Sequence, residues 1–198
     1  KYGTPAQAAL KKLGGLPIDM ICATHGPIWR THIAEIIAKY DKWSKYETDE
    51  GVVIAFSSMY GHTEQMADCI GRFLAEMGIK KFRLHDTSKT HPSYIINDIF
   101  RYKGVILGSC AYNGNIFPTM EILLHELECM GVKNHYWGYF GNKTWGGGAL
   151  PRFKAFAEKI KWDVVAEPNE TCGSMKPSDI EQCKAIAEAM VKKLRGIE

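Results

Sequence analysis

The stretch that decides the fold is Val52-Val53-Ile54-Ala55-Phe56-Ser57-Ser58-Met59-Tyr60-Gly61-His62-Thr63. Its first five residues form a continuous apolar run, which is typical of a strand buried on both faces of a parallel sheet. A polar loop with one glycine follows, and residues 63–77 predict a helix. This strand, loop and helix begin a regular alternation that continues to the end of the chain.

Four more strands and four more helices are expected after this first pair. The expected strands cover residues 80–85, 104–108, 135–140 and a segment that starts at 163–166, and the expected helices cover 93–100, 118–129, 151–160 and 178–194. Strands that alternate with helices build a parallel sheet with helices on both faces. We therefore predict an α/β fold, a doubly wound five-stranded parallel sheet with strand order 2-1-3-4-5.

The residues before this alternation follow a different pattern. Apolar residues at helical spacing predict a helix at 4–13, an apolar run predicts a strand at 18–23, and a second amphipathic helix is expected at 33–43. The polar stretch 45–51 is predicted to be a linker.

Composition and charge exclude several classes of protein. The chain has 198 residues, of which 45% are hydrophobic and 24% are charged, so we expect a packed globular protein. Its apolar runs are far shorter than the ~20 residues that a membrane-spanning helix needs. A net charge of +3 without a basic stripe gives no sign of nucleic-acid binding. The six cysteines include no C-x-x-C pair, which excludes zinc-ribbon and thioredoxin-like sites, and we expect reduced thiols and a cytoplasmic location.

Three turns are expected to form one ligand site, because doubly wound sheets bind ligands beyond the strand ends where the strand order reverses. The first turn, 57–63, enters a helix N-terminus, whose free N–H groups and dipole favour a phosphate. It lacks the Gly-Lys-Ser/Thr of a P-loop and the G-x-G-x-x-G of a dinucleotide site, so a single terminal phosphate fits better. The alternative is that Ser58 and Thr63 only cap the helix.

The other two turns, 109–115 and 141–148, are rich in Gly and Asn. Consecutive glycines allow the backbone to approach a flat ligand closely, and the rings of Tyr112 and Trp145 are suited to flank an aromatic ring. For one turn alone, a flexible loop with Trp145 as a surface anchor is the simpler interpretation. Three such turns at one edge of the sheet favour a bound ring system.

These motifs resemble those of a known family. Ser58-Met59-Tyr60-Gly61-His62-Thr63-Glu64 is similar to the FMN phosphate loop of flavodoxins. Gly108-Ser109 with Tyr112-Asn113 and Phe117-Pro118-Thr119-Met120, then Phe140-Gly141 with Trp145-Gly146-Gly147-Gly148-Ala149, resemble more specifically the flavodiiron proteins, or A-type flavoproteins. Members of that family join a metallo-β-lactamase-like di-iron domain to a C-terminal flavodoxin domain.

The resemblance implies two parts: an incomplete C-terminal segment of a metallo-β-lactamase-like domain at residues 1–46, and a flavodoxin-like FMN-binding domain at residues 47–198. The implied cofactor-binding residues are Ser57, Ser58, Met59, Tyr60, Gly61, His62, Thr63, Ser109, Cys110, Ala111, Tyr112, Asn113, Gly114, Asn115, Gly141, Asn142, Thr144, Trp145, Gly146 and Gly147. The sequence departs from the family pattern at Cys110-Ala111, Gly114-Asn115 and Lys143-Thr144, which affects the ring contacts and the reduction potential expected of the flavin.

The first part of the chain carries one residue that the resemblance marks as a metal ligand. Thr24-His25-Gly26-Pro27-Ile28-Trp29-Arg30 is similar to the final ligand motif of the di-iron domain, so His25 would bind iron if the rest of that domain were present. Two irons need several converging ligands, and the family's H-x-E-x-D-H cluster is absent from this chain. Either the preceding sequence lies on another chain, or this segment is a structural remnant.

The function that the resemblance implies is relay of electrons through FMN to a di-iron centre that reduces dioxygen, nitric oxide or both. It further implies a rubredoxin or rubredoxin reductase system as the electron donor and a head-to-tail homodimer. None of the named residues is expected to be a catalytic acid or base. Alternatives are a free-standing flavodoxin-type electron carrier, an NAD(P)H:quinone reductase-like flavoprotein, and an interaction module without a cofactor.

Overall fold

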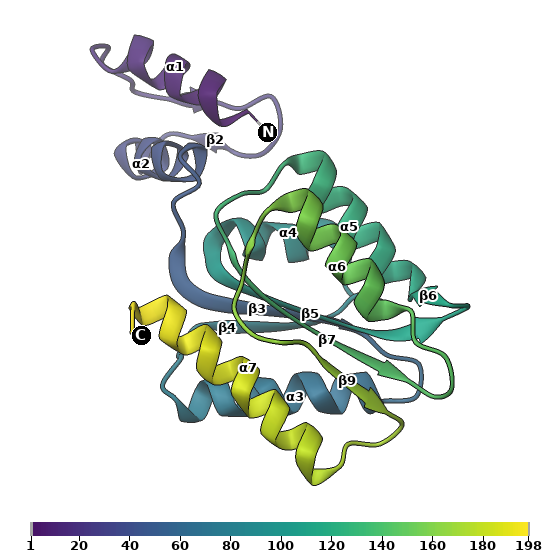
Figure 1. Cartoon of the computed structure of the whole chain (residues 1–198). Helices are drawn as coiled ribbons and strands as arrows, with labels where there is room; N and C mark the ends of the chain where they lie inside the picture. Colours follow the sequence, from purple (N-terminus) through teal and green to yellow (C-terminus); the bar gives the residue numbers. More distant parts are fainter. Residues whose placement is uncertain (1, 198) are drawn as a thin grey trace. The chain divides into compact units, whose positions relative to one another are not determined.

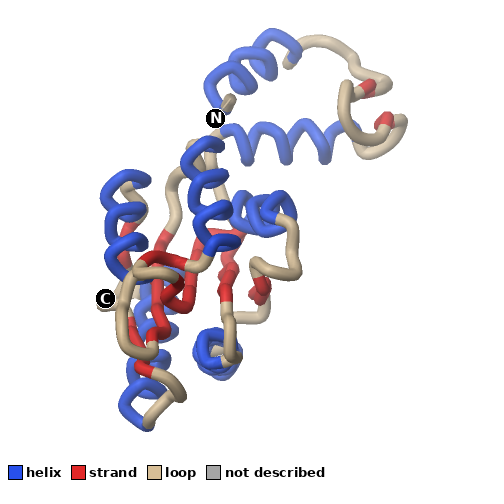
Figure 2. Tube along the Cα trace, turned by 90° about the vertical axis from the view of Figure 1, so that its right-hand side faces the viewer, coloured by secondary structure: helices blue, strands red, loops and turns tan. Residues whose placement is uncertain are grey.

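The computed structural model describes residues 2–197 and divides the chain into two compact units, Lys1–Thr48 and Asp49–Glu198. The first unit contains helix α1 (Gly3–Leu13), the short antiparallel strands β1 (Ile21–Cys22) and β2 (Ile28–Trp29), and helix α2 (Ile33–Ser44). Figure 2 shows the two short strands in the connection between the helices. The strand that was expected at 18–23 is therefore only two residues long.

The first unit has almost no interior of its own. Gly3 and Ile36 are its only buried residues among those described in its two helices. A hollow of about 960 Å³ opens between the helices and β1, and apolar side chains such as Leu10, Ile21 and Ile37 line it. The amphipathic pattern of both helices was predicted correctly, and among the described residues of this unit part of their apolar faces lies open to this hollow.

The second unit is the predicted doubly wound sheet. Its parallel strands are β3 (Asp49–Ser57), β4 (Phe82–Asp86), β5 (Tyr102–Tyr112), β7 (Tyr136–Lys143), β8 (Asp163–Val164) and β9 (Asn169–Cys172). The path across the sheet is β4-β3-β5-β7, with β8 and β9 both on the far side of β7. Counting β8 and β9 as one interrupted strand, this is the predicted order 2-1-3-4-5.

Helices cover both faces of this sheet, as Figure 1 shows. Helices α3 (His62–Glu76) and α7 (Pro177–Arg195) lie on one face, and α4 (Pro92–Arg101), α5 (Pro118–Met130) and α6 (Ala149–Ile160) lie on the other. No helix within residues 2–197 is long and apolar enough to span a bilayer.

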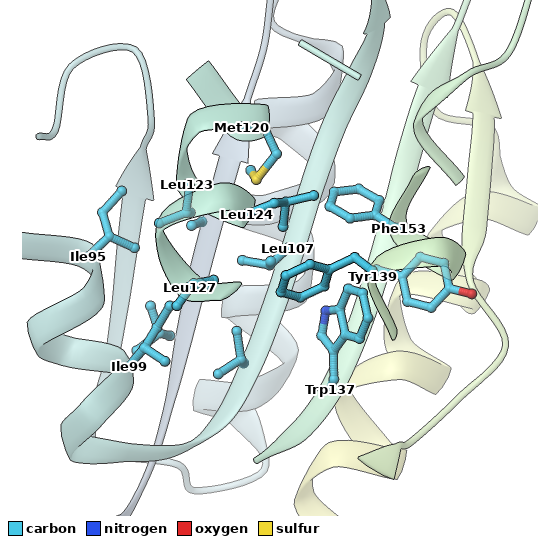
Figure 3. Packing of buried hydrophobic residues seen from close by; sticks show 14 of the residues in the cluster. Ile95, Ile99, Leu107, Met120, Leu123, Leu124, Leu127, Trp137, Tyr139 and Phe153 are labelled. Atoms are coloured by element: carbon cyan, nitrogen blue, oxygen red, sulfur yellow. The ribbon is translucent and has the colours of Figure 1, made fainter. Parts of the chain in front are cut away.

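Each face of the sheet has its own apolar core, because a strand buried on both sides alternates its side chains between them. On β3, Val53 and Ala55 join the α4–α5–α6 side, whereas Val52 and Ile54 join the α3–α7 side. Figure 3 shows the first of these cores, where leucines of α5 meet Trp137 and Phe153. The continuous apolar run of β3 was thus interpreted correctly.

Two boundaries differ from the expectation. The polar residues Asp49-Glu50-Gly51 belong to β3 and not to a linker, since Asp49 pairs in register with Tyr102 and lies 3.5 Å from Arg101. The fifth strand is interrupted between Val164 and Asn169, a segment that contains Pro168. Proline has no N–H to donate to a ladder, so pairing with β7 resumes only after it.

Candidate functional site

The three turns named from the sequence follow adjacent strands of the sheet. Ser57 at the end of β3 is in register with Ser109 of β5, and Ser109 is in register with Gly141 of β7. The hydroxyl oxygens of Ser57 and Ser109 lie 2.8 Å apart, and both side chains are fully buried. The three turns therefore leave the same edge of the sheet side by side.

The first turn is closed by a hydrogen bond between its backbone and a serine side chain, and it presents a helix N-terminus. Gly61 donates its N–H to the Ser58 hydroxyl over 3.0 Å and precedes the first residue of α3. Its φ of 85° is in the left-handed region, which glycine adopts at little cost. Because α3 has 15 residues, its unpaired N–H groups and dipole make this turn electropositive.

Two polar atoms at the start of α3 are buried without a partner: Nδ1 of His62 and the hydroxyl of Thr63. Thr63 is only 1% exposed. An unsatisfied buried polar group costs about 1–3 kcal/mol, so such groups are rare unless a ligand or water satisfies them. The donor set at this turn, free N–H groups with a hydroxyl and an imidazole, fits a phosphate group.

The second turn is a hairpin and not an open loop. Ser109, Cys110, Ala111 and Tyr112 are still part of β5, and β6 (Asn115–Ile116) folds back on them. The two central residues, Asn113 and Gly114, have φ values of 48° and 73°. Asn-Gly is the sequence that favours a two-residue turn with positive φ at both positions, and this feature of the sequence was overlooked.

The third turn also begins later than expected, because Gly141, Asn142 and Lys143 belong to β7. Thr144 to Gly147 are exposed, and Gly148 is buried. A Cβ atom at Gly148 would lie 2.5 Å from the carbonyl carbon of Gly114, so the second and third turns are in direct backbone contact. Only glycine permits this approach.

Each of the three turns carries an aromatic ring that is at least partly exposed. Trp145, Tyr60 and Tyr112 are 95%, 76% and 40% exposed. No atom lies within 4 Å of the position of a Cβ at Gly61 or Gly146. The turns therefore present exposed aromatic rings, and the surroundings of Gly61 and Gly146 are open.

Cys110 lies inside this site but is buried, with 8% exposure. Burial raises the pKa of its thiol, and the backbone of Met59 in the first turn partly offsets that rise through a hydrogen bond. The thiol is therefore protonated near neutral pH, as expected of a packing residue. The contact with Met59 also ties the first turn to the second.

His25 is exposed at the turn between β1 and β2 and lines the apolar hollow of the first unit. Within residues 2–197, no group of three or more His, Cys, Asp or Glu side chains is arranged to hold a metal ion.

A hollow of about 790 Å³ beside α4 and α5, lined by Thr87, Lys89 and Thr119, contains none of the predicted ligand residues.

The residues that flank the third turn from the side of β9 were not predicted from the sequence. Glu170, Cys172 and Gly173 lie on β9 or just after it and contact Gly147, Thr144 and Asn142, respectively. Asn169 and Thr171 are buried in the structure and alternate with less buried neighbours, but the sequence Asn169-Glu170-Thr171-Cys172 has no alternation of hydrophobic and polar residues that would predict a strand.

Comparison with known proteins defines the class. The fold is that of a flavodoxin, and a sequence model of the flavodoxin family matches residues 54–195. The chain belongs to this family. It is also homologous to flavodiiron proteins, of which it spans the flavodoxin part and a short N-terminal segment.

Individual relatives support this assignment. The rubredoxin:oxygen oxidoreductase of Desulfovibrio gigas superposes with a TM-score of 0.91 at 25% identity, over 98% of this chain and 49% of that one. The anaerobic nitric oxide reductase flavorubredoxin of Escherichia coli is 27% identical over 168 residues, which is 79% of this chain and 35% of the relative. An uncharacterized protein of Methanocaldococcus jannaschii is 31% identical over 157 residues, 79% of this chain and 40% of its own length. The chain thus spans half or less of these relatives.

Proposed function

We propose that the second unit binds one FMN in the three turns and passes electrons through it. The observation that carries this proposal is the pair of buried, unpartnered groups, His62 Nδ1 and the Thr63 hydroxyl, at the N-terminus of α3. A terminal phosphate would satisfy both, together with the free N–H groups of the first turn of the helix.

In this proposal the ring system lies between the second and third turns. Trp145 and Tyr112 flank the ring, and the backbone of Gly141, Asn142, Gly146 and Gly147 approaches its polar edge. FMN supplies the redox chemistry, since its ring accepts one or two electrons, while the protein contributes binding, orientation and exclusion of water.

A direct test compares two ligands that differ only in the phosphate. We expect FMN to bind about 10- to 100-fold more tightly than riboflavin, because a charged hydrogen bond contributes about 1.5–3 kcal/mol. Quenching of flavin fluorescence in a titration of the purified protein measures both affinities. Equal affinities, or no binding of either flavin, would refute the proposed phosphate site.

We propose further that residues 1–46 are the last segment of a metallo-β-lactamase-like domain and that electrons pass from the FMN to a di-iron centre. The open apolar side of the first unit supports this, because α1 and α2 leave apolar residues such as Leu13 and Tyr40 exposed. His25 would be one ligand in such a domain. Reduction of dioxygen or nitric oxide and a rubredoxin-type donor are suggested by the names of the relatives from Desulfovibrio gigas and Escherichia coli. A head-to-tail homodimer and a cytoplasmic location belong to the same proposal.

The experiment for this larger proposal is native mass spectrometry of the protein isolated from its source, with iron and flavin counted on the same sample. We expect two irons for each flavin in one assembly. Flavin at full occupancy without iron in any assembly would instead support a free-standing electron carrier.

A further inference from the structure

The third turn is held from its outer side by the last strand of the sheet. Strand β9 runs parallel to the end of β7, with Gly141 opposite Glu170, Asn142 opposite Thr171 and Lys143 opposite Cys172. Figure 1 shows β9 on the far side of β7 from β5. Every residue of the turn from Gly141 to Thr144 therefore has a neighbour on β9 or directly after it.

Three hydrogen bonds join this segment to the turn. The amide of Asn142 donates to the carbonyl of Gly173 over 2.7 Å, and the N–H of Gly173 donates to the carbonyl of Lys143 over 2.9 Å. The thiol of Cys172 donates to the carbonyl of Thr144 over 3.0 Å. The backbone is thus fixed as far as the residue before Trp145.

The charged pair Lys143–Glu170 holds the remainder of the turn. The ammonium of Lys143 contacts the carboxylate of Glu170, and their side chains are 35% and 17% exposed. Oε1 of Glu170 lies 3.0 Å from the position of a Cβ at Gly147, so the carboxylate lies against the glycine run. The hydrogen bond to this carboxylate and its negative charge raise the pKa of Lys143, so the ammonium is protonated at neutral pH.

The two residues of the turn that depart from the flavodiiron pattern, Lys143 and Thr144, are the two that β9 binds through Glu170 and Cys172. Glu170 provides an ion-pair partner for the side chain of Lys143. The bond from Cys172 goes to the backbone carbonyl of Thr144, so it holds the turn whatever side chain position 144 carries.

We propose that Glu170 and Cys172 are positioning residues for the flavin: they fix the shape of the turn Gly141–Gly147, and the Lys143–Glu170 pair adjusts the reduction potential of the ring. This inference rests on the FMN site proposed above. Reduction adds negative charge to the ring, so the Glu170 carboxylate opposes reduction and the Lys143 ammonium favours it. Neither residue donates or accepts electrons.

The test uses Lys143→Met, Glu170→Gln, the double variant, Cys172→Ala and Cys172→Ser, each with FMN titrated by fluorescence and the midpoint potential measured by equilibration with a redox dye. We expect each charge variant to weaken FMN binding about 1.5- to 5-fold, the range for loss of a partly exposed ion pair. The midpoint potential should rise in Glu170→Gln and fall in Lys143→Met, and the two shifts should cancel in the double variant while affinity stays reduced.

The two Cys172 variants distinguish the effect of the hydrogen bond from the effect of packing. Cys172→Ala removes the donor to the Thr144 carbonyl and should weaken FMN binding by about the same factor, whereas Cys172→Ser keeps a hydroxyl donor and should restore most of it. Matched controls lie near the end of α5, which leads into the start of β7 and is therefore at the opposite end of the strands from the turns. Glu128→Gln removes a similarly buried carboxylate that pairs with Lys159, and Cys129→Ala removes an exposed thiol.

The outcomes separate this inference from the proposed function. If the unmodified protein binds no FMN, the proposed site is wrong and the inference falls with it. If the unmodified protein binds FMN but the variants match it in affinity and potential, or both single charge variants shift the potential in the same direction, β9 does not position the flavin as proposed.

Discussion

Gly148 lies so close to Gly114 that a methyl group on it would stand within 2.6 Å of three backbone atoms of the Gly114-Asn115 segment. These residues come from different turns, after β7 and β5, and no side chain separates them. The contact fixes the distance between the two turns that are proposed to hold the ring. The contact also requires glycine at position 148, because any other residue would place a Cβ atom against this backbone.

Gly148→Ala is therefore expected to force the second and third turns apart. Overpacking of this kind costs about 1–3 kcal/mol, and because the neighbours are backbone atoms, no flexible side chain can move aside. We expect weaker FMN binding, by about tenfold or more, with an unchanged far-ultraviolet circular dichroism spectrum. Gly15→Ala is the control, since nothing lies within 4 Å of its Cβ position. Full FMN affinity in Gly148→Ala would show that this contact does not shape the site.

Thr63→Val should have opposite effects on folding and binding. Its hydroxyl is buried without a partner, so an isosteric methyl removes an unsatisfied group, and the free energy of unfolding without FMN should rise by about 1 kcal/mol. FMN affinity should fall about tenfold, because the phosphate loses a donor.

Urea denaturation without FMN and fluorescence titration with it measure the two effects of Thr63→Val separately. Thr63→Ser is the control that keeps the hydroxyl. A Thr63→Val variant that keeps its full affinity for FMN would mean that the Thr63 hydroxyl does not contact the phosphate.

The sequence was sufficient to predict the second unit because its strands are buried on both faces. Val52 to Phe56 has no polar position, and that pattern fits only a sheet covered on both sides. The positions of the turns were predicted from the sequence, but their conformations were not. The Asn113-Gly114 hairpin and the extension of β7 to Lys143 depend on pairing with β6 and β9. Glu170 was missed because its role exists only through Lys143, 27 residues away in the chain.

Stability of the second unit should decrease as the pH falls from about 6.5 toward 4. His135 is 3% exposed, contacts the ring of Trp162 and lies 3.3 Å from the carbonyl of Lys103. Burial lowers its pKa from 6.5 to about 4, with the charge of Lys103 acting in the same direction. Between these pKa values the unfolded chain binds a proton that the folded protein does not. The neutral, buried His135 therefore contributes up to about 3 kcal/mol to the free energy of unfolding, fully above pH 6.5 and not at all below about pH 4.

The measurement for His135 is urea denaturation across this pH range, compared with His135→Asn, whose side-chain amide keeps a donor for the Lys103 carbonyl but does not titrate. The variant should have a flatter profile between pH 4 and 6.5, even if its stability at pH 7 is lower. Parallel profiles for the two proteins would assign the acid sensitivity to other groups.

Trp145 offers the clearest separation of folding from ligand binding. At 95% exposure its ring contacts almost nothing in the protein alone, so Trp145→Ala should leave the thermal midpoint without FMN unchanged within about 1 °C. If the ring flanks the flavin, the same variant should weaken FMN binding about 5- to 100-fold, the range for loss of an aromatic stacking partner at about 1–3 kcal/mol. Trp145→Phe should retain most of the affinity, because it keeps a flat ring at the same position.

Trp43, 42% exposed and in the first unit, provides the control Trp43→Ala, which should leave FMN affinity unchanged. Equal FMN affinity in Trp145→Ala and the unmodified protein would mean that Trp145 does not contact the flavin and that the ring does not lie against the third turn.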